Sequence, residues 1–191
     1  MNLILASASP RRRELMAGVY PDFKVVPADA REYDSGIWPE RLPLVNATNK
    51  ALSVASLYPG ALVIGADTVI ELEERLIGKP GSLEHATEIL HQLSDRTHLV
   101  VTGLHIICVE RKIRCSFVVS TSVTFFPLSA EIIRAYIDGV NVLDKAGAYA
   151  IQEYGEMLVK DIDGPLDNVI GLPCDKLRES LQACGFIHTQ V

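Results

Sequence analysis

The sequence predicts an α/β protein with a mixed, elongated β-sheet flanked by helices. Apolar and β-rich runs of strand length occur at 61–66, 98–108 and 113–126, while apolar residues recur at helical spacing in 42–57 and 82–93. These strand-like and helical segments do not alternate strictly along the chain. A purely parallel, doubly wound sheet is therefore not expected, and a mixed sheet covered by helices fits the pattern better.

The first third of the chain should contain two strands and two helices. Ser9 is a favourable N-cap, and Pro10 suits the first position of a helix, where its missing N–H costs nothing. Gly18 is the expected end of this helix. The expected elements are a strand over Asn2–Ala6, a helix over Pro10–Ala17, a strand over Phe23–Pro27 and a helix over Leu42–Leu57.

The rest of the chain begins with a continuous apolar run that is typical of a buried, central strand. After it we expect a hairpin, two long strands around a charged turn, and three helices, of which the first has an apolar face. The expected elements are a strand over Ala61–Ala66, a hairpin over Val69–Ile77, a helix over Ser82–Leu93, strands over His98–Cys108 and Ile113–Phe126, a helix over Ser129–Ile137, a strand over Glu156–Ile162, a loop over Asn168–Pro173 and a helix over Cys174–Cys184 closed by Gly185.

Composition narrows the classes of function. The chain has 191 residues and a net charge of −6, and an acidic protein is a poor general binder of nucleic-acid polymers. Its four cysteines form no CxxC pair and no other metal-ligand spacing. The N-terminal apolar run is too short for a signal peptide, and no apolar stretch is long enough to span a bilayer. We therefore expect a cytoplasmic protein that binds neither nucleic-acid polymers nor membranes.

The run Ser7–Arg13 joins the first strand to the first helix and contains three arginines. Cations are disfavoured there, because the N-terminus of a helix carries partial positive charge. A bound anion would remove the conflict, since backbone N–H groups, the hydroxyls of Ser7 and Ser9 and guanidinium groups such as that of Arg11 would face it. A solvated helix start is the other interpretation, and the run alone leaves both open.

Asp67 directly follows the buried run Ala61–Ala66, at the expected end of the central strand. Ligand crevices form at the C-terminal ends of sheet strands, and a carboxylate buried there without a partner would be costly. Asp67 could instead cap a turn, but its position favours a functional role. Taken alone, Lys50 predicts a surface charge on a helix, and Lys79 predicts a solvated lysine on a loop tip.

A further motif, Asp144–Gln152, contains small residues flanked by polar ones. This pattern indicates backbone packed tightly against another group. Gln152 both donates and accepts hydrogen bonds, as recognition of a base edge requires. The alternative is a close-packed turn with Tyr149 in the core.

The order and spacing of these motifs closely resemble those of the Maf family of nucleoside triphosphate pyrophosphatases, over essentially the whole chain. The segments that carry the resemblance are Ser7–Arg12, Lys50, Gly65–Thr68, Gly78–Pro80, Asp144–Gln152 and Asn168–Pro173. The resemblance implies a single Maf-like domain over residues 1–191. It also implies an inosine-triphosphatase-like fold with two lobes around a cleft.

The resemblance further implies hydrolysis of a nucleoside triphosphate to the monophosphate and pyrophosphate, with Mg²⁺ or Mn²⁺. Asp67 looks like the carboxylate that activates water. Glu32 matches an acidic residue that helps to hold the metal, together with Asp67. The family's substrate-selectivity positions are matched by Arg11, Thr68 and Gln152. Its phosphate-binding lysines are matched by Lys50 and Lys79. The predicted substrate site also includes Ser7 and Ser9.

The form of the Asp144–Gln152 motif is similar to that of the family branch acting on dTTP and UTP. A preference for 7-methyl-GTP or another modified nucleotide stays open, because Glu153 and Pro165–Asp167 depart from the family's usual residues beside the expected base pocket. A non-catalytic, nucleotide-sensing regulator of cell division is a second alternative. A kinase or phosphatase is disfavoured by the lack of a Walker-type glycine loop and of a nucleophile motif. The sequence leaves a homodimer open.

Overall fold

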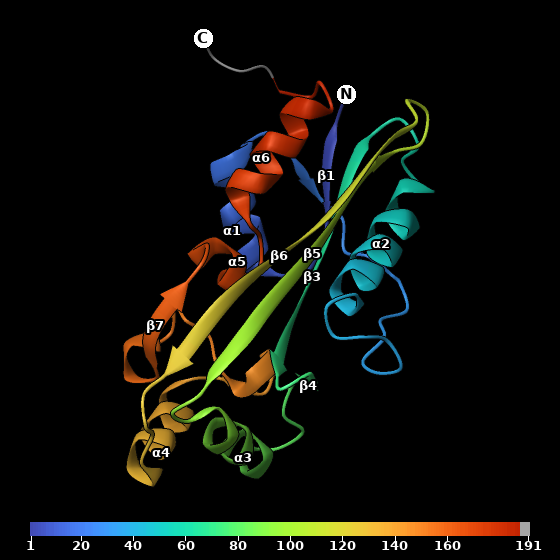
Figure 1. Ribbon diagram of the computed structural model, residues 1–191. Helices are drawn as coiled ribbons and strands as arrows, with labels where there is room; N and C mark the ends of the chain where they lie inside the picture. Colours follow the sequence, from blue (N-terminus) through green and yellow to red (C-terminus); the bar gives the residue numbers. More distant parts are fainter. Residues whose placement is uncertain (188–191) are drawn as a thin grey trace. The chain divides into compact units, whose positions relative to one another are not determined.

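The computed structural model describes residues 1–187, which form a seven-stranded mixed sheet with helices packed against it (Figure 1). The strand order is β2-β1-β3-β5-β6-β7, and β4 pairs with β3 off this path. β1 runs parallel to β2 and β3, whereas the β3–β4 and β6–β7 pairs are antiparallel. The strands are β1 (Leu3–Ala6), β2 (Lys24–Val25), β3 (Leu62–Leu72), β4 (Arg75–Ile77), β5 (Thr97–Cys108), β6 (Ile113–Phe125) and β7 (Val159–Asp163).

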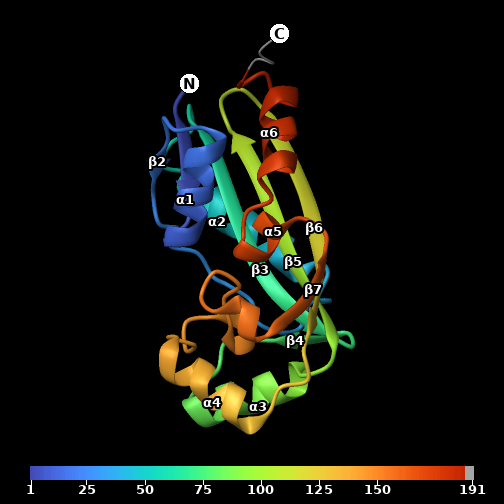
Figure 2. The ribbon, with the colours of Figure 1, turned by 90° about the vertical axis from the view of Figure 1, so that its left-hand side faces the viewer.

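Six α-helices and two 3₁₀ turns are found among the described residues (Figure 2). The longest has 14 residues, and none of the helices in residues 1–187 has the length and apolar character needed to cross a bilayer. The helices are α1 (Pro10–Val19), α2 (Leu42–Ala55), α3 (Leu83–Leu93), α4 (Ala130–Gly139), α5 (Leu166–Ile170) and α6 (Cys174–Ala183), and the 3₁₀ turns are Ala146–Ala148 and Gly155–Met157.

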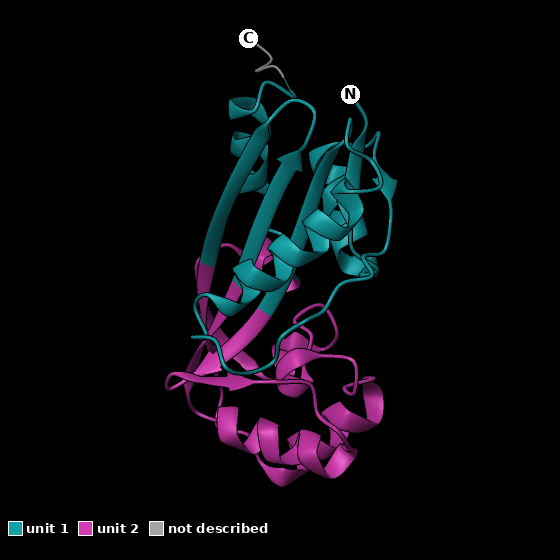
Figure 3. Cartoon of the chain, turned by 90° about the vertical axis from the view of Figure 1, so that its right-hand side faces the viewer, with its two compact units in different colours: residues 1–68, 102–119, 171–191 teal, residues 69–101, 120–170 magenta. Residues whose placement is uncertain are grey.

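The chain divides into two compact units (Figure 3). Unit 1 comprises residues 1–68, 102–119 and 171–191, of which the described part ends at residue 187. Unit 2 comprises residues 69–101 and 120–170. The long strands β3, β5 and β6 each contribute residues to both units.

In unit 1, helices cover both faces of the sheet because successive strand residues point to opposite sides. Leu5 of β1 belongs to a core cluster with Met16 of α1 and Leu181 of α6. Its neighbour Ile4 belongs to a second cluster, in which α2 contributes Ala51. The apolar stripes of three helices thus bury the two faces of one short, fully buried strand.

Two glycines let α2 approach the sheet closely. A Cβ atom on Gly65 of β3 would lie 2.1 Å from the carbonyl oxygen of Ala47, and one on Gly103 of β5 would lie 2.4 Å from the backbone nitrogen of Leu44. Such distances are far below van der Waals contact, so no larger residue fits at either position without movement of the helix. The close approach brings α2 side chains within reach of the β3 residues that follow Gly65.

Unit 2 has a core of its own, built from the far parts of β3, β5 and β6 with α3 and α4. Within it His98, Phe125 and Tyr149 form edge-to-face ring contacts with centroids 4.9 to 5.5 Å apart. Tyr149 is 6% exposed, so the expected alternative of a tyrosine in the core is confirmed. Tight packing of the same motif is confirmed at Gly147 (φ +69°), where a Cβ would lie 2.5 Å from Cδ1 of Ile70.

The mixed sheet flanked by helices confirms the predicted fold class, while several element boundaries differ from the prediction. The first helix continues through Gly18 to Val19, and the backbone N–H of Tyr20 caps its end by donating to the carbonyl of Met16. β3 continues without a break through Asp67 into the hairpin. The segment 168–173 is not all loop, since residues up to Ile170 form α5, and β7 begins only at Val159, after a 3₁₀ turn.

Candidate active site

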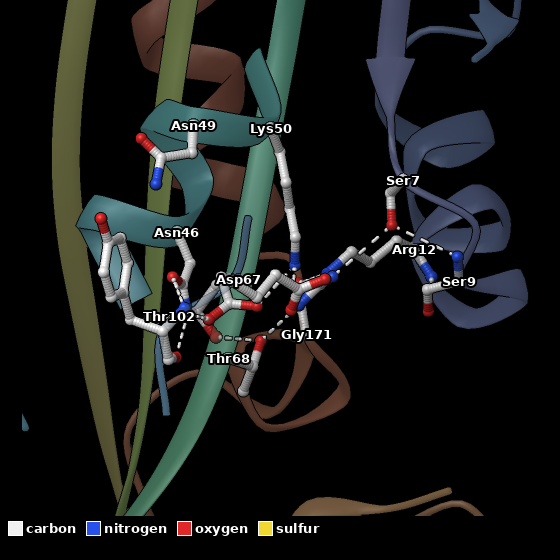
Figure 4. Close-up of polar contacts among 12 residues, drawn as sticks. Ser7, Ser9, Arg12, Asn46, Asn49, Lys50, Asp67, Thr68, Thr102 and Gly171 are labelled. Atoms are coloured by element: carbon white, nitrogen blue, oxygen red, sulfur yellow. Dashed lines mark hydrogen bonds and ion pairs between the residues drawn. The ribbon is translucent and has the colours of Figure 1, made fainter. Parts of the chain in front are cut away.

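Asp67 lies in the middle of β3 rather than at a strand end, and its side chain is 11% exposed. The strand continues because the partners of this carboxylate come from α2 instead of from a turn. Oδ1 accepts a hydrogen bond from the ammonium of Lys50 at 2.7 Å, and Oδ2 accepts one from Nδ2 of Asn46 at 3.0 Å (Figure 4). The expected strand-end position was wrong, but the expected need for a partner is met: both oxygens are paired, which offsets the cost of burial.

Lys50 is buried, so the surface charge that its helix alone predicted is wrong. Its ammonium lies between two carboxylates, 2.7 Å from Asp67 and 3.0 Å from Oε2 of Glu32. The side chain of Glu32 is 59% exposed, whereas that of Asp67 is almost covered. The ammonium of Lys50 thus bridges an exposed and a buried carboxylate.

Asn46 completes this cluster, and sequence reasoning did not include it in the site. Its side-chain amide bonds to both backbone groups of Tyr33 and to Asp67. The signal was present in the spacing: Asn46 and Lys50 are four residues apart, so they share a helix face. That face is the buried one, since Ala47 and Ala51 beside them are fully buried.

At the start of α1 the structure brings Arg12 toward β3, although Arg11 was the arginine singled out in the sequence. Nη2 of Arg12 donates to Oγ1 of Thr68 at 2.8 Å, and Nε donates to the carbonyl of Gly171 at 2.9 Å. A longer contact of 3.5 Å joins Nη1 to Oγ of Ser7. The interpretation in which all three arginines simply face water is therefore wrong for Arg12.

The charges around Arg12 explain how a cation is accommodated at a helix N-terminus. Burial lowers the pKa of its guanidinium, the negative charges of Asp67 and Glu32 act against that shift, and Arg11 adds to it. Carboxylates of the protein thus supply part of the negative charge that the arginine run requires. Arg11 is partly exposed and makes contacts of its own.

Three hydroxyl groups of the predicted site have defined roles in unit 1. Ser9 caps α1, its Oγ accepting from the backbone N–H of Arg12 at 3.4 Å, which confirms the predicted N-cap. The buried Ser7 accepts from the backbone N–H of Ser9 at 3.2 Å. Thr68 lies 3.0 Å from the hydroxyl of the fully buried Thr102 on β5, another residue that sequence reasoning did not include.

Lys79 and Gln152 belong to unit 2, and both side chains are exposed. Their loops are tied together, because the backbone N–H of Gly147 donates to the carbonyl of Gly78 at 3.0 Å. The motif also contains a buried lysine, Lys145, whose ammonium pairs with Asp144 and with Glu153. The other predicted site residues all lie in unit 1.

Comparison with known proteins places the chain in a family. The sequence model of the family described as Maf-like protein matches residues 2–184. The chain belongs to the Maf-like protein family. Relatives named dTTP/UTP pyrophosphatase include one from Carboxydothermus hydrogenoformans (strain ATCC BAA-161 / DSM 6008 / Z-2901), 40% identical over 97% of this chain and 100% of the relative, and one from Akkermansia muciniphila, 41% identical over 96% and 97%.

The fold of this Maf-like protein also resembles a solved structure, that of the Staphylococcus aureus Ham1 protein. The TM-score is 0.55, with 18% sequence identity, and the match covers 96% of this chain and 99% of the other. The similarity extends over nearly the whole chain and supports the predicted fold class. At this level of identity it concerns the fold alone.

The donor set of this Maf-like protein suits a hard divalent cation. Glu32 and Asp67 already share the cationic ammonium of Lys50, so a metal between them would find two carboxylate ligands. In residues 1–187 no group of three or more His, Cys, Asp or Glu side chains is arranged to hold a metal. Mg²⁺ takes one or two carboxylates from a protein and completes its shell with water and substrate phosphates, so the two carboxylates are sufficient.

Proposed function

We propose that the protein hydrolyses nucleoside triphosphates, foremost dTTP and UTP, to the monophosphate and pyrophosphate. The observation that carries the proposal is the cluster around Asp67. Its buried carboxylate is hydrogen-bonded to Lys50 and interacts electrostatically with the guanidinium of Arg12. A buried carboxylate supplies a general base, and fixed cations suit a dense polyanion. The name that several relatives at about 40% identity carry agrees with this chemistry.

The proposed reaction is attack of water on the α-phosphorus. The water oxygen forms the new P–O bond, its proton passes to Asp67, and the bond from the α-phosphorus to the bridging oxygen breaks, so that pyrophosphate leaves. Each carboxylate oxygen has two lone pairs, so Asp67 can accept this proton while Asn46 stays bonded to Oδ2. Lys50 is proposed to turn from the carboxylates to the phosphate oxygens when substrate binds.

A divalent cation held by Glu32 and Asp67, Mg²⁺ or Mn²⁺, would neutralise charge on the phosphates and lower the pKa of attacking water. Lys50 and Lys79 are proposed as point charges for the phosphate chain. Arg11 is proposed as a forked donor, with Ser7 and Ser9 beside it at the start of α1. Catalysis of this kind depends mainly on positioning and electrostatic stabilisation.

Gln152 and Thr68 are proposed to select the base. Thr68 accepts a hydrogen bond from Arg12, so its own proton is directed to Thr102 or to a ligand. An amide and a hydroxyl together match the polar edge of a pyrimidine. A site with such groups rejects a base that leaves them unpaired.

The test is a panel of dTTP, UTP, ATP, GTP and 7-methyl-GTP, each with Mg²⁺ and with Mn²⁺, in which pyrophosphate and orthophosphate are measured separately. We expect pyrophosphate as the first product, the highest kcat/KM with dTTP and UTP, and loss of turnover in excess EDTA. Orthophosphate as the primary product, or full activity in EDTA, would refute the reaction. A preference for 7-methyl-GTP would refute only the choice of base.

A further inference from the structure

We infer that Asn46 is a positioning residue. It holds the carboxylate of Asp67 in place and fixes the segment 31–33, which carries Glu32, next to that carboxylate. This inference rests on the proposed function, in which Asp67 is the general base. Asn46 is 3% exposed, on the buried face of α2. It was outside the site residues that the sequence motifs predicted, and it touches the chemistry only through Asp67.

The amide of Asn46 uses its whole donor capacity. Oδ1 accepts from the backbone N–H of Tyr33 at 2.8 Å, and Nδ2 donates to the backbone carbonyl of Tyr33 at 2.9 Å. The second hydrogen on Nδ2 goes to Oδ2 of Asp67 at 3.0 Å. An amide has only two N–H donors, so neither of them is left over, and the two bonds to Tyr33 orient the third.

The two partners of Asp67 differ in what they do when a substrate arrives. Lys50 holds Oδ1 through a flexible four-carbon side chain, and the proposed reaction requires its ammonium at the phosphates. Asn46 has a short side chain whose amide is held by two bonds to the backbone of Tyr33, so it can stay bonded to Oδ2 during the whole reaction. Once Lys50 moves, the bond from Asn46 remains as a protein contact that orients the carboxylate.

The same amide links two distant parts of the site. Tyr33 follows Glu32 directly, so fixing both backbone groups of Tyr33 fixes the origin of the Glu32 side chain. Its hydrogen bonds therefore join the segment of one carboxylate to the other carboxylate. Positions of catalytic groups must hold to within a fraction of an ångström, and errors of about 1 Å cost roughly 10²-fold in rate.

The chain offers a matched control one turn away. Asn49, also on α2, donates from Nδ2 to the carbonyl of Arg31 at 3.3 Å. This bond also joins the segment 31–33 to α2, but Asn49 has no bond to Asp67 among those described. A substitution at Asn49 therefore removes one tie of the segment and leaves the carboxylate's partners unchanged.

The experiment compares Asn46→Leu and Asn46→Ser with Asn49→Leu, using dTTP and Mg²⁺. For both Asn46 variants we expect kcat to fall about 10- to 100-fold with KM for dTTP within about threefold of wild type. Asn49→Leu should keep kcat within about twofold. A kcat near that of wild type in folded Asn46 variants would overturn the inference, and so would an equal loss in Asn49→Leu.

Amide hydrogen exchange of a peptide that includes Tyr33 gives a readout that does not depend on activity. Exchange should accelerate in the Asn46 variants, since the Tyr33 N–H loses its acceptor, and unchanged exchange would contradict the inference. If the wild type releases no pyrophosphate, the proposed function fails, while exchange still reports whether Asn46 holds the segment.

A crystal structure of the wild type with an α,β-imido analogue of dTTP and Mg²⁺ keeps the inference testable if the variants do not fold. The expected result is an intact bond between Asn46 and Asp67 with Lys50 turned to the phosphates. A structure in which Asn46 has left Asp67 would refute the inference.

Discussion

Two buried lysines, Lys50 in unit 1 and Lys145 in unit 2, have the same arrangement of charges and different surroundings. Each ammonium pairs with two carboxylates. The partners of Lys145, Asp144 and Glu153, lie within eight residues of it and are 58% and 40% exposed. Lys145 also donates to the backbone carbonyl of Asn141, so its contacts close one local loop.

Lys50 instead joins parts of the chain that are far apart in sequence. Glu32 lies on a loop and Asp67 on a central strand, and the Asp67 side chain is only 11% exposed. Little of that carboxylate is open to solvent, whereas water can solvate both carboxylates of Lys145. The difference favours a functional role for the Lys50 pair, because a carboxylate that is buried and distant in sequence is costly to keep for structure alone.

The largest expected effect is that of Asp67→Asn. The substitution keeps the size of the side chain and removes the proton acceptor, so kcat for dTTP should fall roughly 10²-fold or more, with nucleotide affinity better preserved. The matched control is Asp144→Asn, which alters a carboxylate of the other lysine and should leave kcat within about threefold. Near wild-type turnover in Asp67→Asn would mean that Asp67, like Asp144, has only a structural role.

Removing each lysine tests the comparison through stability. Lys50→Met leaves a buried carboxylate with one neutral partner, and should lower the free energy of unfolding by about 3 kcal/mol. Lys145→Met leaves carboxylates that water reaches, so about 1 kcal/mol or less is expected. Urea unfolding at pH 7 measures both values. Equal decreases in the free energy of unfolding would mean that the exposure of the partner carboxylates does not determine the effect of removing the lysine.

Unit 2 has a titratable core residue, His98, through which its stability depends on pH. Burial lowers the pKa of His98 to about 4, against about 6.5 in the unfolded chain. Between these values the unfolded state binds more protons, so stability is fully present above pH 6.5 and is lost as the pH falls toward 4. From pH 7 to pH 5 the free energy of unfolding should fall by about 2 kcal/mol from this residue.

The measurement is urea unfolding of wild type and His98→Gln at pH 7 and pH 5. The variant lacks the imidazole, so its stability should fall by about 2 kcal/mol less than that of wild type over the same interval. An identical fall in the two proteins would show that other groups account for the acid response.

The smallest expected effect concerns the motif Asp144–Gln152, which contains Lys145. If Gln152 reads the base, Gln152→Ala should reduce the ratio of kcat/KM for dTTP to that for GTP by about fivefold, the value of one neutral hydrogen bond. Glu153→Gly removes one carboxylate of Lys145 beside it and should change that ratio less. A ratio that Gln152→Ala leaves unchanged would remove this residue from the base pocket, and a larger effect of Glu153→Gly would give Lys145 a role in specificity.

Sequence patterns predicted most of the elements because the strands and helices carry strong apolar periodicity. The long strands β5 and β6 and the helix α3 lie within one or two residues of their expected bounds. The errors fall where tertiary partners override a local signal. Asp67 suggested a strand end, yet β3 continues through it because Lys50 and Asn46 pair both of its oxygens.

The sequence by itself determined the fold class, the capped start of α1 and the motifs whose order indicates the family. Only the tertiary structure decided which of the neighbouring arginines reaches Thr68, that Lys50 is buried, and that Asn46 joins Asp67 to the segment of Glu32. The reason is geometric. Gly65 and Gly103 let α2 lie against the sheet, and that close approach turns polar residues of an ordinary helix inward, a contact between distant segments that no local pattern specifies.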